Sequence, residues 1–194
     1  MKFISSQDLN QIVSKTVADN NLKCVGIYKL QRKLYPVVMV VGSIVASALS
    51  FFTIKSYTDS LESKADKLRI VVCIGIFLIA ALFVQVIIHE CIHIVSMLIV
   101  GKKKTEIYIT VGKRTLGVLY NGFLRKWYDV FTRISPVFVL TAVITFLSII
   151  FSNVFLFLWL EFINLLLSST DIASAITIII HTPHDAIFYS NYYK

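Results

Sequence analysis

The sequence predicts an all-α membrane protein with about four transmembrane helices and a short β-hairpin in the 101–133 segment. Its 194 residues are 57% apolar and 15% charged, and the mean hydropathy is +0.77. Soluble domains contain about 45–50% apolar and about 25% charged residues. A soluble domain this small could not cover so much apolar surface, so we expect a large share of the chain to face lipid.

Four apolar runs are long enough to span a bilayer. They are residues 37–54, 70–100, 134–151 and 154–180. The first has 18 residues without a charge, about the length that a membrane core requires. The second, at about 1.5 Å per residue, exceeds the roughly 30 Å core and must tilt or protrude.

The runs divide the chain into an N-terminal segment, 1–36, and one membrane domain, 37–194. The N-terminal segment has apolar positions at helical spacing and is expected at the cytoplasmic membrane surface. In 101–133, alternating apolar residues at 107–111 and 116–120 flank a Gly-Lys-Arg turn, which predicts a β-hairpin. Its edge strands would suit pairing with an extended peptide, although a simple surface loop explains the pattern equally well.

Charge indicates orientation rather than nucleic-acid binding. The net charge is +8, but the basic residues lie between the apolar runs and form no continuous face. Segments 1–36 and 101–133 carry six and eight Lys and Arg, against four in 55–69. We therefore expect a multi-pass protein of the bacterial cell membrane with both termini in the cytoplasm. No cleavable signal peptide is visible, and the three cysteines show no paired spacing, so we expect free thiols.

Residues 89–93 read His-Glu-Cys-Ile-His, with two histidines four positions apart inside the second run. On a helix the imidazoles of His89 and His93 share one face and can hold a Zn²⁺ ion, while Glu90 can take a proton from a zinc-bound water. The alternative is that all three side chains lie near the helix end and bind nothing. That alternative explains neither the spacing nor the cost of three polar groups in lipid.

A third ligand is needed, and depth along the helices favours Asp171. His89 and His93 lie about 29–35 Å along their run from its outer end, and Asp171 lies about 26 Å along a continuous fourth helix. Glu161 lies only about 10 Å along, so we expect it to be satisfied inside the bundle.

Other polar residues have simpler explanations. His181, His184 and Asp185 resemble a solvated helix stop around a proline. Asp129, in the basic segment, is expected to be a surface charge.

These residues resemble the site-2 protease class of intramembrane metalloproteases, and in particular the bacterial putative zincin peptidases. The resemblance covers about residues 70–185 and rests on 89–93, the Ser135-Pro136 pair and the stretch 164–171. It implies that Asp171 completes the zinc site, that Asn164 lines it as a contact to substrate or oxyanion, and that three helices form the catalytic core. The prolines and the glycine of the family's Asn-Leu-Leu-Pro…Leu-Asp-Gly stretch are missing here.

The predicted function is that of a zinc-dependent, membrane-embedded endopeptidase acting on peptides or membrane proteins in or near the bilayer. One alternative is a membrane-embedded protease of soluble peptides. Another is a non-enzymatic metal-binding membrane protein, against which Glu90 argues because a structural metal site does not require it.

Overall fold

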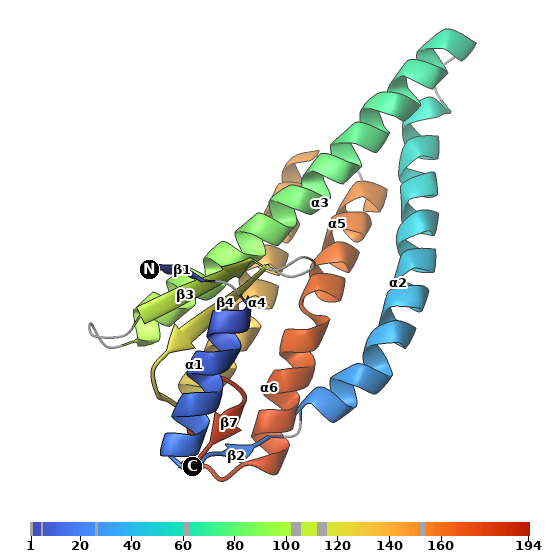
Figure 1. The fold of residues 1–194 in the computed structure, drawn as a ribbon. Coiled ribbons are helices and arrows are strands. Elements are labelled where there is room, and N and C mark those ends of the chain that lie inside the picture. The colour runs from blue at the N-terminus through green and yellow to red at the C-terminus, as the bar shows by residue number, and fades with distance from the viewer. Residues whose placement is uncertain are drawn as a thin grey trace. The chain divides into compact units, whose positions relative to one another are not determined.

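A computed structural model gives the fold (Figure 1). It describes residues 2–4, 6–25, 27–59, 63–101, 106–111, 116–151 and 154–194. The helices are α1 (Ser6–Asp19), α2 (Ile27–Thr58), α3 (Lys64–Val100), α4 (Lys126–Phe151), α5 (Val154–Leu167) and α6 (Ser169–His181). The strands are β1 (Lys2–Ile4), β2 (Lys23–Cys24), β3 (Glu106–Val111), β4 (Leu116–Asn121), β5 (Leu124–Arg125), β6 (Ile187–Tyr189) and β7 (Tyr192–Tyr193).

The helices confirm a mostly helical chain with apolar spans. By length and composition, parts of α2, α3 and α4 can each cross a membrane, and the bent pair α5 and α6 can form one more span. Large apolar side chains along these helices are exposed, among them Ile76 at 63% and Ile149 at 77%. Such surface on helices with few charges is what lipid contact requires.

The fourth predicted run is not one continuous helix. It bends by 50° between α5 and α6. At the break, the Ser169 hydroxyl donates to the Leu166 carbonyl at 2.8 Å, and the Ser168 N–H donates to the Asn164 carbonyl at 3.0 Å. Serine hydroxyls that compete for helix carbonyls bend helices, and the Ser169 hydroxyl is placed to do so here.

The chain contains more strand than the sequence predicted. The predicted hairpin is confirmed as β3 paired antiparallel with β4, and its expected turn at 112–114 lies outside the described residues. In addition, β1 pairs with β3 in parallel, which gives the strand order β1-β3-β4. A second sheet has the order β2-β7-β6-β5, so the tyrosine-rich tail is a strand pair.

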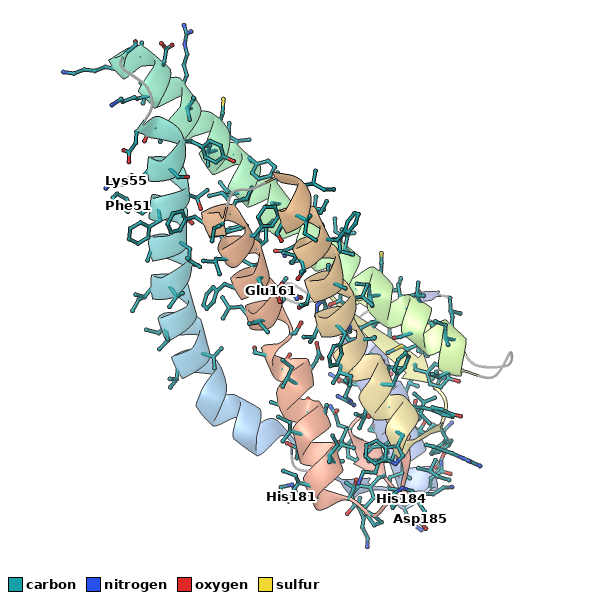
Figure 2. The ribbon with its side chains drawn as sticks, turned by 180° about the vertical axis from the view of Figure 1, so that it is seen from behind. Phe51, Lys55, Glu161, His181, His184 and Asp185 are labelled. Atoms are coloured by element: carbon teal, nitrogen blue, oxygen red, sulfur yellow. The ribbon has the colours of Figure 1, made fainter. Side chains whose placement is uncertain are left out.

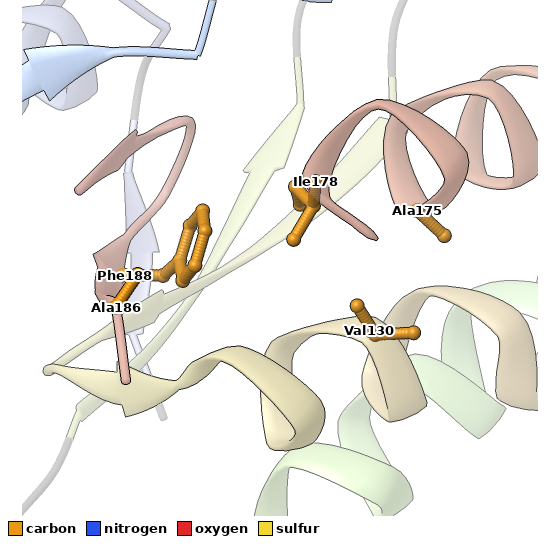
Figure 3. Close-up of a cluster of buried hydrophobic side chains, with 5 residues drawn as sticks. All are labelled: Val130, Ala175, Ile178, Ala186 and Phe188. Carbon is orange, nitrogen blue, oxygen red and sulfur yellow. The ribbon is translucent and has the colours of Figure 1, made fainter. Parts of the chain in front are cut away.

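The chain divides into two compact units. The first comprises Met1–Arg32, Glu90–Pro136 and Thr170–Lys194 and contains both sheets. One of its clusters packs Val130 of α4 and Ala175 and Ile178 of α6 against Ala186 and Phe188 (Figure 3). A second cluster joins the end of α3 to the β3–β4 sheet. Its members are Ile107, Tyr120 and Leu124, with Ile94, Met97, Val100 and Val118 at its margin.

The second unit comprises Lys33–His89 and Val137–Ser169. Its buried cluster is formed by Leu78, Trp159 and Ile163. Gly42 of α2 lies close to α5, because a Cβ there would lie 2.5 Å from Cδ2 of Leu166, whose side chain would have to shift. This unit therefore consists of apolar helices packed on one another.

Candidate metal centre

The two histidines of the motif lie one turn apart on α3, and both are buried, His89 at 5% exposure and His93 at 9%. Gln85 and Ser96 are buried along the same helix, whereas the neighbouring Ile88 is 42% exposed. The helix thus exposes apolar side chains and keeps these polar side chains inside. This is the arrangement expected of polar groups that have a role in a membrane helix.

Asp171 lies in the first turn of α6, where the positive end of the helix dipole favours a carboxylate. One of its carboxylate oxygens, Oδ2, lies 3.4 Å from Nε2 of His93. The bend before α6 is therefore part of how the sequence places this carboxylate. The prediction from helical depth assumed a straight helix, and its assumption of continuity was wrong.

Ligand atoms of His89, His93 and Asp171 all lie within 4.8 Å of one another. Helix α3 runs without a break from His89 to His93, so the helix itself fixes the spacing of the two imidazoles. Zinc binds nitrogen and oxygen at about 2.0–2.2 Å with tetrahedral angles, which separates two ligand atoms by about 3.3–3.5 Å. The His93–Asp171 distance of 3.4 Å fits that separation.

The orientation of His93 also fits a metal ligand. Its Nδ1 lies 2.8 Å from the backbone carbonyl oxygen of Thr132. A carbonyl only accepts, so Nδ1 carries the hydrogen and, in the neutral ring, Nε2 presents its lone pair toward Asp171. A lone pair and a carboxylate oxygen repel each other unless a cation or proton lies between them. Such a backbone contact is the usual second support of a metal-binding histidine.

Glu90 follows His89 on α3 and is half-buried. Its position on the helix, next to one proposed ligand and three residues before the other, keeps it near the face that both histidines share. A carboxylate placed there has the reach of a general base in zinc peptidases. Its role stays a prediction.

Asn164 lies on α5 and is fully buried. Its side-chain nitrogen donates to the Thr141 hydroxyl at 3.1 Å and to the Val137 carbonyl at 3.4 Å, both on α4. These contacts connect two helices of the second unit. The proposed contact of Asn164 with substrate or oxyanion stays a prediction.

The residues given simpler explanations divide into two groups. Glu161 is paired inside the bundle, because its Oε1 accepts a hydrogen bond from the Thr141 hydroxyl. His181, His184 and Asp185 are exposed at the end of α6 and just beyond it, as a helix stop requires (Figure 2).

Asp129 is not a surface charge. It is 6% exposed and pairs with Arg133 at 2.8 Å on the next turn of α4. Arg133 also donates to the Ser190 carbonyl and to Asn191 Oδ1, at 3.0 and 3.1 Å. The pair therefore fixes the turn between β6 and β7 to α4, a tertiary contact that the charge pattern of the sequence could not reveal.

Comparison with known proteins now decides the family. The model of the family described as putative zincin peptidase matches residues 82–187, which is just over half of the chain and includes His89, His93 and Asp171. The chain belongs to this family. No curated protein and no solved structure gives a match.

Membership and geometry agree on the metal. The family implies a zinc peptidase, and the two imidazoles and one carboxylate are a donor set that zinc peptidases use, with one coordination position left for water or substrate. Among the described residues this group has three members, which is the number of protein ligands in a catalytic zinc site, whereas a structural site has four.

Proposed function

We propose that this putative zincin peptidase is a membrane-embedded endopeptidase of the site-2 protease type, which hydrolyses peptide bonds in or beside the bilayer. His89, His93 and Asp171 hold the zinc ion. The observation that carries this assignment is the His93 ring, whose Nδ1 is bound to the Thr132 carbonyl at 2.8 Å while Nε2 lies 3.4 Å from Asp171. A zinc ion between Nε2 and the carboxylate oxygen would account for their approach.

The chemistry follows from the side chains around this point. A bound zinc ion would activate the attacking water and polarise the scissile carbonyl. Glu90 takes the proton of that water as the new C–O bond forms, and it gives the proton to the leaving nitrogen as the C–N bond breaks. The Thr132 carbonyl keeps the His93 ring in one orientation throughout.

The substrate is a peptide or a membrane protein with an extended segment. A helix in lipid conceals its peptide bonds, so cleavage requires unwound backbone whose N–H and C=O groups find partners. In the described sheet, β3 is flanked by β1 and β4, and β4 (Leu116–Asn121) lies at the edge. An extended peptide added to β4 would gain backbone hydrogen bonds.

The location is the bacterial cell membrane, with both termini in the cytoplasm. Support comes from the candidate spans and from the excess of Lys and Arg in 1–36 and 101–133. The lipid bilayer is thus one partner and the peptide substrate the other.

The test is metal content and hydrolysis by protein purified in detergent. We expect about one zinc ion per chain by elemental analysis. We also expect cleavage of a labelled transmembrane peptide that stops when phenanthroline removes the metal and returns when zinc is added. Correctly folded protein without metal would contradict the proposal.

The two alternative functions give different results in the same assay. A protease of soluble peptides would cleave labelled casein in preference to the transmembrane peptide. A non-enzymatic metal protein would bind zinc and cleave neither substrate.

A further inference from the structure

Pro136 lies inside α4, four residues after Thr132. In an α-helix the N–H of residue 136 would donate to the carbonyl of residue 132. Proline has no N–H, so this helical hydrogen bond cannot form. The Thr132 carbonyl is therefore released from its usual helical partner at the point where it accepts from Nδ1 of His93 at 2.8 Å.

We propose that Pro136 is a positioning residue for the metal centre, because it frees the Thr132 carbonyl to orient His93. Pro136, Thr132 and His93 all belong to the first unit. The Ser135 hydroxyl also donates to this carbonyl, at 3.2 Å, and a carbonyl oxygen has two lone pairs, so both donors can be accommodated. A restored helical N–H would be a third donor competing for the same oxygen.

This inference rests on the proposed function for its purpose, and Pro136→Ala tests it. Alanine restores the N–H and favours helix more than proline does, so stability should be unchanged or higher. Loss of a contact that orients a ligand usually lowers metal affinity about 10–100-fold, and we expect a fall in that range. If Pro136 had only a structural role, the zinc affinity of Pro136→Ala would change in the same direction as its stability.

The matched control is Ser135→Ala, which removes the neighbouring donor and leaves the proline. It should bind zinc as tightly as the wild type. If Pro136→Ala does not fold, Pro136→Leu restores the same N–H with a bulkier apolar side chain. Wild-type zinc affinity in a folded Pro136 variant would overturn the proposal.

A metal-independent measurement separates this proposal from the proposed function. Nitrogen-15 NMR of labelled histidine in metal-free protein reports which ring nitrogen of His93 carries the hydrogen. We expect Nδ1 of His93 to carry a hydrogen that is bonded to the Thr132 carbonyl in the wild type, and this hydrogen bond to be weakened in Pro136→Ala. A wild type that binds no zinc but shows this change would refute the peptidase function and retain the positioning role. The same hydrogen bond in both proteins would refute the role itself.

A second and independent inference concerns polar side chains in the second unit. Glu161 and Asn164 of α5 and Ser168, which directly follows that helix, are spaced at intervals of three and four, so they lie on one side of it. Asn164 and Ser168 are fully buried. Gln85 of α3, which is 6% exposed, donates to the Leu160 carbonyl of α5 at 2.8 Å and so lies beside them.

Three hydrogen bonds connect the residues of this cluster. Asn164 donates to Thr141, Thr141 donates to Glu161, and Gln85 donates to α5. Four buried atoms have no hydrogen-bond partner among the described residues. They are Gln85 Oε1, Glu161 Oε2, Asn164 Oδ1 and Ser168 Oγ. Three of the four are oxygens that only accept, so they need donors that the described residues do not supply.

We infer that these residues line a water-filled pocket inside the apolar bundle. One water donates two hydrogen bonds and carries no charge, so it supplies what the acceptors lack. A nearby cavity of about 400 Å³ differs from this pocket in its lining, which is mainly apolar. Thr53 of α2 and Leu156 of α5 are among the residues that line it. For a hydrolase in lipid, buried water would also be a local supply of the second substrate.

Cysteine labelling tests this pocket without any need for activity. A thiol reacts with a water-soluble methanethiosulfonate as its thiolate, which requires water around it. In a background with Cys24, Cys73 and Cys91 changed to serine, we compare Ser168→Cys with two controls. Thr53→Cys is fully buried beside the apolar cavity, and Leu165→Cys lies on α5 at a position 46% exposed to lipid.

We expect Ser168→Cys to react about tenfold faster than either control. A rate equal to that of Thr53→Cys would mean a dry pocket and overturn the inference. A rate that changes when choline replaces sodium would indicate a bound cation in place of water and overturn it equally. Gln85→Cys repeats the test from α3 if Ser168→Cys does not fold.

Discussion

Nε2 of His93 lies 3.4 Å from Oδ2 of Asp171, although 78 residues separate them in the chain. The first comes from a long apolar helix and the second from a helix that starts at a bend. The approach of these two atoms is the geometry on which the following predictions depend.

Removing either of these side chains should remove zinc. Asp171→Ala and His93→Ala each leave two protein ligands in place of three, which is too few to retain zinc through purification. Elemental analysis should show most of the metal lost. Glu161→Gln is the matched control, because it changes another half-buried acid of the α5–α6 pair and should keep the metal. Retention of zinc by Asp171→Ala would exclude Asp171 as a ligand.

Glu90→Gln should keep zinc and lose hydrolysis. The amide has the same shape as the acid but cannot accept the proton of the attacking water, and loss of a general base costs about 10²–10⁴-fold in rate. Initial rates with the labelled transmembrane peptide give the measurement. Cys91→Ser, at the exposed neighbouring position, should cleave at the wild-type rate. Near wild-type cleavage by Glu90→Gln would remove Glu90 from its role.

Orientation in the membrane can be measured at two exposed positions. Ser63 precedes α3, and Asp185 follows α6. If both termini are cytoplasmic, a membrane-impermeant thiol reagent should label Ser63→Cys from outside intact cells. Asp185→Cys should be labelled only after the cells are opened. The reverse pattern would invert the orientation while leaving the metal chemistry unchanged.

The sequence predicted features that depend on local spacing. His89 and His93 share a face because they are four residues apart, and β3 and β4 pair because a short turn joins alternating segments. Strands β1, β2, β5, β6 and β7 were missed. They are two or three residues long, too short for a periodic pattern, and β1 pairs with a segment about 100 residues away.

The hydrogen bond between His93 and the Thr132 carbonyl was also missed, although the sequence contains one sign of it, Pro136. A proline inside an apolar run releases the carbonyl four residues earlier, which points to Thr132 as an available acceptor. The sequence could not identify His93 as the donor to this carbonyl. His93 is 39 residues away, and only the packing of α3 against α4 brings it to Thr132. The same holds for the bend at Ser168, whose direction depends on neighbouring helices.

Lys126 should contribute to stability far more than an ordinary surface lysine. It is 5% exposed, and its Nζ donates to the carbonyls of Ile179 and Thr182 at 3.0 and 2.8 Å, at the end of α6. These carbonyls lack helical donors, and a buried charged donor contributes about 1.5–3 kcal/mol per hydrogen bond. Lys126→Met keeps most of the buried stem but leaves both carbonyls unsatisfied, so the melting temperature in detergent should fall clearly.

The effect of Lys126 should extend to the metal, because α6 also carries Asp171 in its first turn. We expect Lys126→Met to weaken zinc binding less than Asp171→Ala does, since the ligand remains but the helix that carries it is held less firmly against α4. Arg125→Met removes a neighbouring exposed charge and should change neither property. A Lys126→Met protein as stable as the wild type would show that water replaces the ammonium at the end of α6, and that the contacts of Val130 with Ala175 and Ile178 suffice to hold the helix.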